Sequence, residues 1–327
     1  MKTKIATLAA NQQVTGLFGL RDLTVRTSKA GRDYLELALC DSSGKIKGYL
    51  LDDVAEALES LEADSVVQVH AVIHLYNGVL EMKIQTVRPV REEEADIREF
   101  APVVTGGVAP WKVKLLAILG LIRNSNCRRI VDAFTSDEVF MDRFVHAPAG
   151  LIEHHNYVGG LLEHTVNVMR HAAFLSKGNE ALINRDLLLT GCFLHDIGKT
   201  KEIDGMLTLK YTMPGRLLGH TVLGASMLEE RIKRIGPYPA DLAMLFKHMI
   251  LYHHVEAGVG SLVVPCTPEA ITLHEADSTD AKINHLYCHL GESEENRLWS
   301  HYDGFLKTEI LQRNSFGASL PYKSEAA

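Results

Sequence analysis

Histidine residues that could bind a metal ion are concentrated in one half of the chain. The chain has 327 residues and 16 histidines, of which the first is His70 and 14 lie between His146 and His301. A neutral imidazole is the commonest metal ligand in proteins, and it also transfers protons near neutral pH. The uneven placement therefore predicts a metal centre in the second half of the chain.

Histidines and aspartates form an ordered series in this half. The series consists of His164, His195, Asp196, His220, His253, His254 and Asp277. Mixed imidazole and carboxylate donors suit Mn, Fe, Zn or Ni, whereas all-oxygen sites suit Mg or Ca. Asp196 has two oxygens and could bridge two ions. His195 and Asp196 can both reach an ion if a helix ends there, because neighbours within a helix point about 100° apart.

Such a centre suits the hydrolysis of phosphodiesters. Hydrolysis of a phosphodiester is slow because its anionic charge repels a nucleophile and because water is a poor one. Metal ions neutralise developing charge and lower the pKa of water towards neutrality. The residue types are therefore chemically compatible with phosphoester hydrolysis.

Helices are expected to position these residues. From Trp111 onward, apolar residues recur at helical spacing, starting with Val113, Leu116, Leu119 and Ile122. Further helices are predicted at residues 126–135, 137–145, 156–176, 185–198, 217–235, 239–253 and 268–289. This part of the chain is therefore expected to be all-α.

The first part of the chain reads as β-rich. Strands are predicted at 14–26, 34–39, 45–51, 66–75 and 79–90, with a short helix at 52–61 for which Asp52 is a candidate N-cap. Asn77-Gly78 is a strong hairpin signal. Three strands, one short helix and a hairpin is the order of an OB-fold, a five-stranded barrel that often binds single strands or oligosaccharides.

The aromatic residues of this barrel have two interpretations. Phe18, Tyr34, Tyr49 and Tyr76 could stack on the bases of a single strand, or they could belong to the barrel core and its hairpin. Residues 12–90 carry 8 Lys/Arg against 11 Asp/Glu, so the barrel is not basic as a whole. The core interpretation is favoured, and nucleic-acid binding is a weaker prediction than the fold.

Length and composition limit the classes of protein to which the chain can belong. We predict an OB-fold domain at 12–90, a linker at 91–110 and an all-α domain at 111–315. The net charge of −7 excludes a polycation that coats nucleic acid. Five scattered cysteines without a Cys-x-x-Cys pair predict no disulfide framework and fit a reducing, cytoplasmic setting. No apolar run approaches the roughly 18 residues of a membrane helix, so no membrane partner is expected.

The order of the metal-ligand candidates resembles that of the HD-domain phosphohydrolase superfamily, over roughly residues 150–290. More narrowly, the chain resembles the YhaM-type 3′-to-5′ exoribonucleases, in which an OB-fold precedes an HD domain. The stretches that carry this resemblance are His154-His155, Gly159 to His164, His195 to Lys199, Leu217 to His220 and Leu273 to Lys282.

The resemblance implies a role for each residue of the series. His164, His195, Asp196 and Asp277 would hold the first metal, and Asp196, His220 and His253 the second, with His254 as a further ligand or a neighbour of one. Lys199 would reach the scissile phosphate. His154, His155 and Arg216 are candidate substrate contacts, although loop histidines are often only solvated. Glu163 could support the first ligand or lie on the surface.

Three functions remain open from the sequence. The first is a metal-dependent 3′-to-5′ exoribonuclease on single-stranded RNA, or also DNA, with two divalent ions, Mn before Fe, Ni or Zn. The second is an HD-domain phosphohydrolase of a small nucleotide or cyclic dinucleotide, with the OB-fold used for assembly. The third is a non-catalytic nucleic-acid-binding protein.

The resemblance also implies a homo-oligomer. The segment Val255–Leu262 and Ser278 depart from the usual family pattern, which puts substrate fit near the second metal in doubt.

Overall fold

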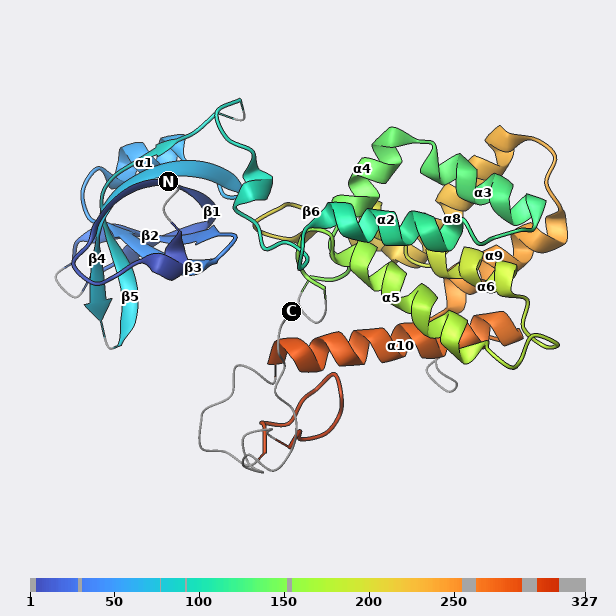
Figure 1. The fold of residues 1–327 in the computed structure, drawn as a ribbon. Coiled ribbons are helices and arrows are strands. Elements are labelled where there is room, and N and C mark those ends of the chain that lie inside the picture. Colours follow the sequence, from blue (N-terminus) through green and yellow to red (C-terminus); the bar gives the residue numbers. More distant parts are fainter. Residues whose placement is uncertain are drawn as a thin grey trace.

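The computed structural model describes residues 4–28, 31–76, 78–91, 93–151, 155–254, 263–289 and 299–311. A β-barrel formed by the first part of the chain lies beside a helical domain formed by the second part (Figure 1). The long helix α10 (Pro268–His289) runs along one side of the helical domain, and it packs against α5 and α6. The predicted order of an all-β domain followed by an all-α domain is therefore confirmed.

The barrel has the topology of an OB-fold. Its strands are β1 (Gln13–Thr27), β2 (Asp33–Asp41), β3 (Gly44–Leu50), β4 (Ser65–Tyr76) and β5 (Val79–Pro89), with the helix α1 (Val54–Ser60) between β3 and β4. They close in the order β1-β2-β3-β5-β4, with β1 antiparallel to β4 and β3 parallel to β5. The short 3₁₀ helices η1 (Ile5–Thr7) and η2 (Ile97–Glu99) flank the barrel in sequence.

The aromatic residues of the barrel divide between its two surfaces. Phe18 is fully buried and belongs to the core. Tyr34 and Tyr49 lie partly exposed on the outside of β2 and β3, with ring centroids 6.0 Å apart. Tyr76 is 63% exposed near the end of β4. The core interpretation is thus right for Phe18, while the three tyrosines have surface that a ligand could contact.

The predicted N-cap of α1 is wrong by one residue. The residue before the helix is Asp53, which has a left-handed backbone (φ 55°) and makes no side-chain capping bond. A left-handed aspartate turns the chain sharply. The chain therefore enters α1 through a backbone turn, which the capping pattern at Asp52 did not reveal.

The helical domain contains nine helices within the described residues. These are α2 (Val108–Leu119), α3 (Ser125–Thr135), α4 (Glu138–His146), α5 (Gly160–Leu175), α6 (Arg185–Leu194), α7 (Lys199–Glu202), α8 (Met213–Ile235), α9 (Ala240–Tyr252) and α10. A two-stranded hairpin, β6 (Ile203–Asp204) and β7 (Lys210–Tyr211), joins α7 to α8. Helix α8 is interrupted at Gly219, whose φ of +73° is not helical. The helix predicted at 185–198 ends at Leu194, and neither the hairpin nor the interruption was predicted.

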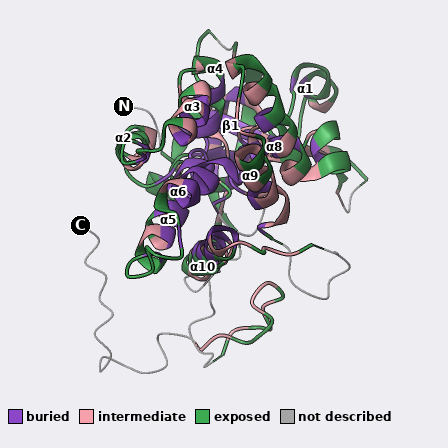
Figure 2. Ribbon diagram, turned by 90° about the vertical axis from the view of Figure 1, so that its right-hand side faces the viewer, coloured by how far each residue is buried: buried purple, intermediate pink, exposed green. Residues whose placement is uncertain are grey.

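Helix α6 lies at the centre of the domain. Every residue from Leu187 to Leu194 is buried (Figure 2). Phe193 packs against Phe134 and Phe144, which belong to α3 and α4. A helix that is apolar on all sides must be surrounded by other elements. The apolar stretch thereby carries His195 and Asp196 into the middle of the domain.

The segment between the two domains is packed rather than loose. Phe100 and Ala101 are buried in a small apolar cluster that also contains Cys40, Val158 and Leu207. The limits predicted for the domains, 12–90 and 111–315, remain predictions. No helix among the described residues is long and apolar enough to cross a membrane.

The close packing of α7 against α8 can be tested at Gly198. A β-carbon on Gly198 would lie 1.9 Å from the carbonyl oxygen of His220. Overpacking of this kind usually costs about 1–3 kcal/mol. We expect Gly198→Ala to lower the free energy of unfolding in urea by that amount. The control is Gly304→Ala, which adds a β-carbon with no atom within 4 Å. Equal stability of the two variants would contradict the packing.

Candidate metal centre

The predicted ligands come together from five helices. His164 lies on α5, and His195 and Asp196 directly follow α6. His220 lies on α8, His253 and His254 directly follow α9, and Asp277 lies on α10. Because α6 ends at Leu194, both residues of the His195-Asp196 pair can turn towards the same point. All of these side chains except those of His220 and His254 are buried.

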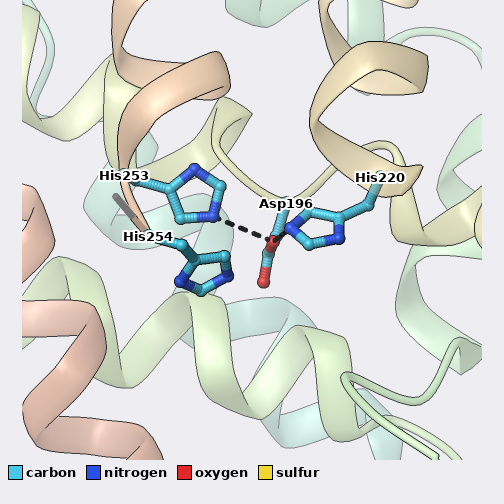
Figure 3. Close-up of side chains that lie close together, drawn as sticks. All are labelled: Asp196, His220, His253 and His254. Carbon is cyan, nitrogen blue, oxygen red and sulfur yellow. Dashed lines mark ion pairs between the residues drawn. The ribbon is translucent and has the colours of Figure 1, made fainter. Parts of the chain in front are cut away.

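The two oxygens of Asp196 face different pairs of histidines. Oδ2 lies 3.4 Å from Nε2 of His164 and 3.3 Å from Nε2 of His195. Oδ1 lies 3.5 Å from Nε2 of His220 and 3.5 Å from Nε2 of His253. Figure 3 shows this second pair approaching the carboxylate from two helices. The carboxylate thus lies between two groups of donors and could bridge them.

Asp277 connects the same two groups. Its Oδ1 lies 3.1 Å from Nε2 of His164, and its Oδ2 lies 3.2 Å from Nδ1 of His254. The side chain of His254 is 46% exposed, in contrast to the fully buried His253. His254 therefore lies at the edge of the centre, where solvent or a substrate can reach it.

Lys199 brings a positive charge into the centre. Its Nζ lies 2.7 Å from Oδ2 of Asp196, and its side chain is only 6% exposed. Burial would lower the pKa of this ammonium group, but the carboxylate of Asp196 outweighs burial and raises it. Lys199 is therefore protonated and its charge is directed at the carboxylate of Asp196.

Two of the imidazoles are oriented by backbone carbonyls. Nδ1 of His195 donates to the carbonyl of Cys192 at 2.7 Å, and Nδ1 of His253 donates to that of Ile250 at 2.8 Å. Each acceptor lies in the last turn of a helix, where carbonyls have no partner within the helix. With its proton on Nδ1, a neutral imidazole presents the lone pair of Nε2 to the opposite side, here towards Asp196.

Two further imidazoles are oriented by carboxylates. Nδ1 of His164 donates to Asp280 at 2.7 Å, and Nδ1 of His220 donates to Glu202 at 3.2 Å. Neither Asp280 nor Glu202 was predicted from the sequence to have a role. The available signal was helical spacing, because Asp280 lies three residues after Asp277 and Glu202 three residues after Lys199.

The environment separates the pKa values of these histidines. Burial lowers the pKa of His253 to about 4, and burial also lowers that of His220. Burial acts on His164 in the same direction, but Asp196, Asp277 and Asp280 outweigh it and hold the pKa of His164 well above its usual value. Without a metal, His253 is therefore neutral and His164 is protonated near neutral pH.

The unpartnered atoms indicate that the centre fits divalent metal ions. Oδ1 of Asp196 and the Nε2 atoms of His220 and His253 are buried without a hydrogen-bond partner. One possible set of ligand atoms, from Asp196, His220, His253 and His254, lies within 4.8 Å of one another, and so does a second set from His164, His195 and Asp196. Two ligands about 2.1 Å from one ion lie about 3 Å apart at right angles. The donor types and spacing therefore suit two ions that share Asp196.

The chain is similar in sequence to known proteins. Residues 161–282 match the HD domain family. A 3′-5′ exoribonuclease YhaM from Oceanobacillus iheyensis is 32% identical over 296 residues, which cover 88% of this chain and 89% of that protein. The chain belongs to the YhaM 3′-5′ exoribonuclease family. A YhaM from Geobacillus sp. is 31% identical over 277 residues, covering 84% of this chain and 83% of that protein.

A domain of replication protein A from Methanococcus maripaludis was also found among solved structures. It covers 28% of this chain and 97% of that domain, at 20% identity and a TM-score of 0.25. The OB-fold assignment rests on the strand order of the barrel itself.

Of the substrate contacts predicted from the YhaM resemblance, His155 is buried. It is 1% exposed, and its Nε2 lies 2.9 Å from Oδ2 of Asp280. Its Nδ1 lies 2.9 Å from the hydroxyl of Tyr157, which donates to Glu163 at 2.6 Å. This position suits support of Asp280 better than contact with a phosphate. Glu163 therefore belongs to the network that supports the first group of donors.

The remaining predicted residues lie further from the donors or outside the described residues. His154 and the segment Val255–Leu262 are outside the described residues. Arg216 is exposed on α8, four residues before His220. His248 accepts a hydrogen bond from the backbone of Cys266 at 3.1 Å.

The support of His164 can be tested with Asp280→Asn. Both imidazoles donate to one oxygen of Asp280, and a neutral amide oxygen in its place is a weaker acceptor than the carboxylate. Loss of such support usually weakens metal binding about 10- to 100-fold. We expect a weakening in this range in a calorimetric titration with Mn²⁺. The control is Asp303→Asn, since Asp303 pairs with His285 at 2.6 Å outside the centre. Equal Mn²⁺ affinity of the two variants would show that Asp280 does not support the metal centre.

Metal binding should also depend on pH. An imidazole must be neutral to bind a metal ion, so an ion that binds His164 must displace the extra proton of this raised-pKa histidine. His253, with a pKa of about 4, is already neutral above pH 6 and releases no proton. Affinity for Mn²⁺ should therefore fall about tenfold for each unit of pH decrease from 8 to 6. Titrations in buffers of different ionisation enthalpy should show release of at least one proton. An affinity that is independent of pH would contradict the raised pKa of His164.

Proposed function

We propose that the chain, a metal-dependent 3′-to-5′ exoribonuclease by family, hydrolyses single-stranded RNA at a centre of two divalent ions bridged by Asp196. The observation that carries this proposal is the placement of the two carboxylate oxygens, each of which faces its own pair of imidazole nitrogens. A single ion beside His164 and His195 would leave the Nε2 atoms of His220 and His253 buried without a hydrogen-bond partner. The bound ions would neutralise charge on the phosphate and lower the pKa of a water molecule.

The proposed ligands fall into two sets with one shared member. The first set is His164, His195, Asp196 and Asp277, and the second is Asp196, His220, His253 and His254. Imidazole-rich sets of this kind suit Mn, Fe, Ni or Zn better than Mg or Ca. We propose Mn²⁺ as the physiological ion, with the other three transition metals as the alternatives.

The residues of the chain contribute charge and orientation to the reaction. Lys199 holds a buried ammonium group beside Asp196, where it would attract and position the anionic scissile phosphate. His254 and Arg216 are partly or fully exposed and would contact the phosphates of the incoming strand. Glu202 and Asp280 would hold His220 and His164 in place. A phosphate at this point would therefore be surrounded by positive charge.

The barrel is proposed to bind the single strand through Tyr34 and Tyr49. Stacking of bases on aromatic rings is tolerant of sequence and adds about 1–3 kcal/mol per base. Lys47 lies on the same surface, although Glu36 pairs with it at 3.3 Å. RNA would have to displace this acidic partner. We also propose that the chain is cytoplasmic, from its scattered cysteines, and that it forms a homo-oligomer, from family resemblance.

Hydrolysis from the 3′ end can be measured directly. Protein with Mn²⁺ should shorten 5′-labelled single-stranded RNA into a ladder that loses length from the 3′ end. Asp196→Ala should lower the rate at least about 1000-fold, equivalent to about 4 kcal/mol of lost stabilisation. Asp241→Ala, which removes an exposed aspartate of α9, should not change the rate. Each variant is compared with the unchanged protein at saturating Mn²⁺.

Two outcomes would contradict the proposal. Turnover of a small nucleotide or cyclic dinucleotide without cleavage of RNA would favour the phosphohydrolase in which the barrel serves assembly. Inactivity on both kinds of substrate, with Asp196→Ala indistinguishable from the unchanged protein, would favour a non-catalytic binding protein.

A further inference from the structure

The hairpin of β6 and β7 joins two parts of the metal centre. Lys199 and Glu202 lie on α7 directly before the hairpin, and His220 follows it on α8. The returning strand is fixed to α7, because Thr212 donates its backbone N–H to the carbonyl of Glu202 at 2.9 Å. A β-carbon on Gly215 would lie 2.2 Å from that same carbonyl oxygen. A shift of the hairpin would therefore move Glu202 relative to His220.

The tip of this hairpin is bound by the carboxylate of a barrel residue. Oδ1 of Asp64 accepts the backbone N–H groups of Met206, Leu207 and Thr208 at 3.1, 2.6 and 3.0 Å. The N–H of Asp64 in turn donates to the carbonyl of Leu20 on β1 at 2.8 Å. Three backbone donors on one carboxylate oxygen hold the tip in a single position relative to the barrel.

A second set of contacts fixes the same tip. Nε of Arg21 donates to the carbonyl of Leu207 at 2.8 Å, and the hydroxyl of Thr208 donates to the carbonyl of Arg21. The side chain of Leu207 is 3% exposed and lies so close to Gly19 that a β-carbon there would be 2.7 Å from Cδ1 of Leu207. The hairpin tip is therefore docked on the barrel by both polar and apolar contacts.

We propose that Asp64 is a positioning residue of the metal centre, although it belongs to the barrel. It holds the hairpin tip, the hairpin fixes Glu202, and Glu202 orients His220 through hydrogen bonds at 3.0 and 3.2 Å. The inference rests on the proposed role of His220 as a metal ligand. On this account the barrel has two roles: it binds the strand, and it completes the geometry of the second set of ligands.

The side chain of Asp64 can be removed without straining the backbone. Asp64 has a left-handed φ of 62°, which glycine adopts readily. Asp64→Gly in the full-length protein therefore removes the acceptor and keeps the turn. Asp64→Asn is the conservative variant, because asparagine also tolerates this conformation and retains one acceptor oxygen. Glu59→Ala, which changes an exposed carboxylate of α1, is the matched control.

Three measurements follow the effect from the hairpin to the centre. In the metal-free protein, Asp64→Gly should speed hydrogen exchange at the amides of Leu207, Thr208 and His220. It should weaken Mn²⁺ binding about 3- to 10-fold in calorimetric titrations, somewhat less than direct loss of a ligand's support. It should lower kcat on bis(p-nitrophenyl) phosphate by a similar factor with little change in KM. This substrate has no strand for the barrel to bind.

Further variants test whether Asp64 acts on the metal centre through Glu202 and His220. Asp64→Asn should recover most of the Mn²⁺ affinity, and Glu202→Gln should give a larger defect of the same kind as Asp64→Gly. Combining Asp64→Gly with Glu202→Gln should add little, because both act through His220. If Asp64→Gly proves too unstable to purify, Arg21→Met removes the donor to Leu207 and should give a smaller defect of the same kind.

Loss of RNA hydrolysis with unchanged Mn²⁺ affinity and unchanged cleavage of the small diester would overturn the inference, because the barrel would then only deliver RNA. His220→Ala separates this failure from a failure of the ligand assignment. If His220→Ala leaves Mn²⁺ affinity unchanged, the assignment of the second set is wrong. If His220→Ala weakens binding and Asp64→Gly does not, the assignment stands and the role of Asp64 is wrong.

Discussion

The arrangement of the helical domain depends on one buried carboxylate. Asp196 is fully buried, and burial by itself would raise its pKa. The ammonium group of Lys199 and the neighbouring imidazoles of His195 and His164 outweigh burial and hold the pKa well below its usual range, so the group is anionic. An anion in an apolar interior is costly unless cations and hydrogen-bond donors surround it. The convergence of helices around α6 supplies these partners and, in the active protein, leaves room for metal ions.

Orientation of the ligands is distributed over the whole domain. Two imidazoles are held by carbonyls at the ends of α6 and α9, and two by carboxylates from α7 and α10. In each case a hydrogen bond to Nδ1 directs Nε2 towards Asp196. The structure thus combines the ordinary requirements of helix ends with the requirements of metal coordination.

Sequence order predicted which candidate ligands come together, because each one lies within a helix or directly follows one. The barrel was also predictable, because the Asn77-Gly78 hairpin signal and the alternation of apolar residues in strands are local patterns of the sequence. Three supporting contacts were not predicted: Asp280 with His164, Glu202 with His220, and Asp64 with the hairpin tip. They join residues that lie 18 to 144 positions apart. Local patterns carry no information on such pairings. Burial of His155 was equally inaccessible, because its partner Asp280 lies 125 residues away.

The interruption of α8 at Gly219 has a consequence for the stability of that helix. His220 begins a new helical segment, so its backbone N–H has no carbonyl from the preceding turn. Glu202 accepts this N–H and the imidazole Nδ1 of the same residue with one oxygen. Glu202 therefore acts as an N-cap supplied by another helix. A single oxygen atom of Glu202 therefore stabilises the start of the second segment of α8 and orients the imidazole of His220, a candidate metal ligand. Substitutions at position 202 will change both together.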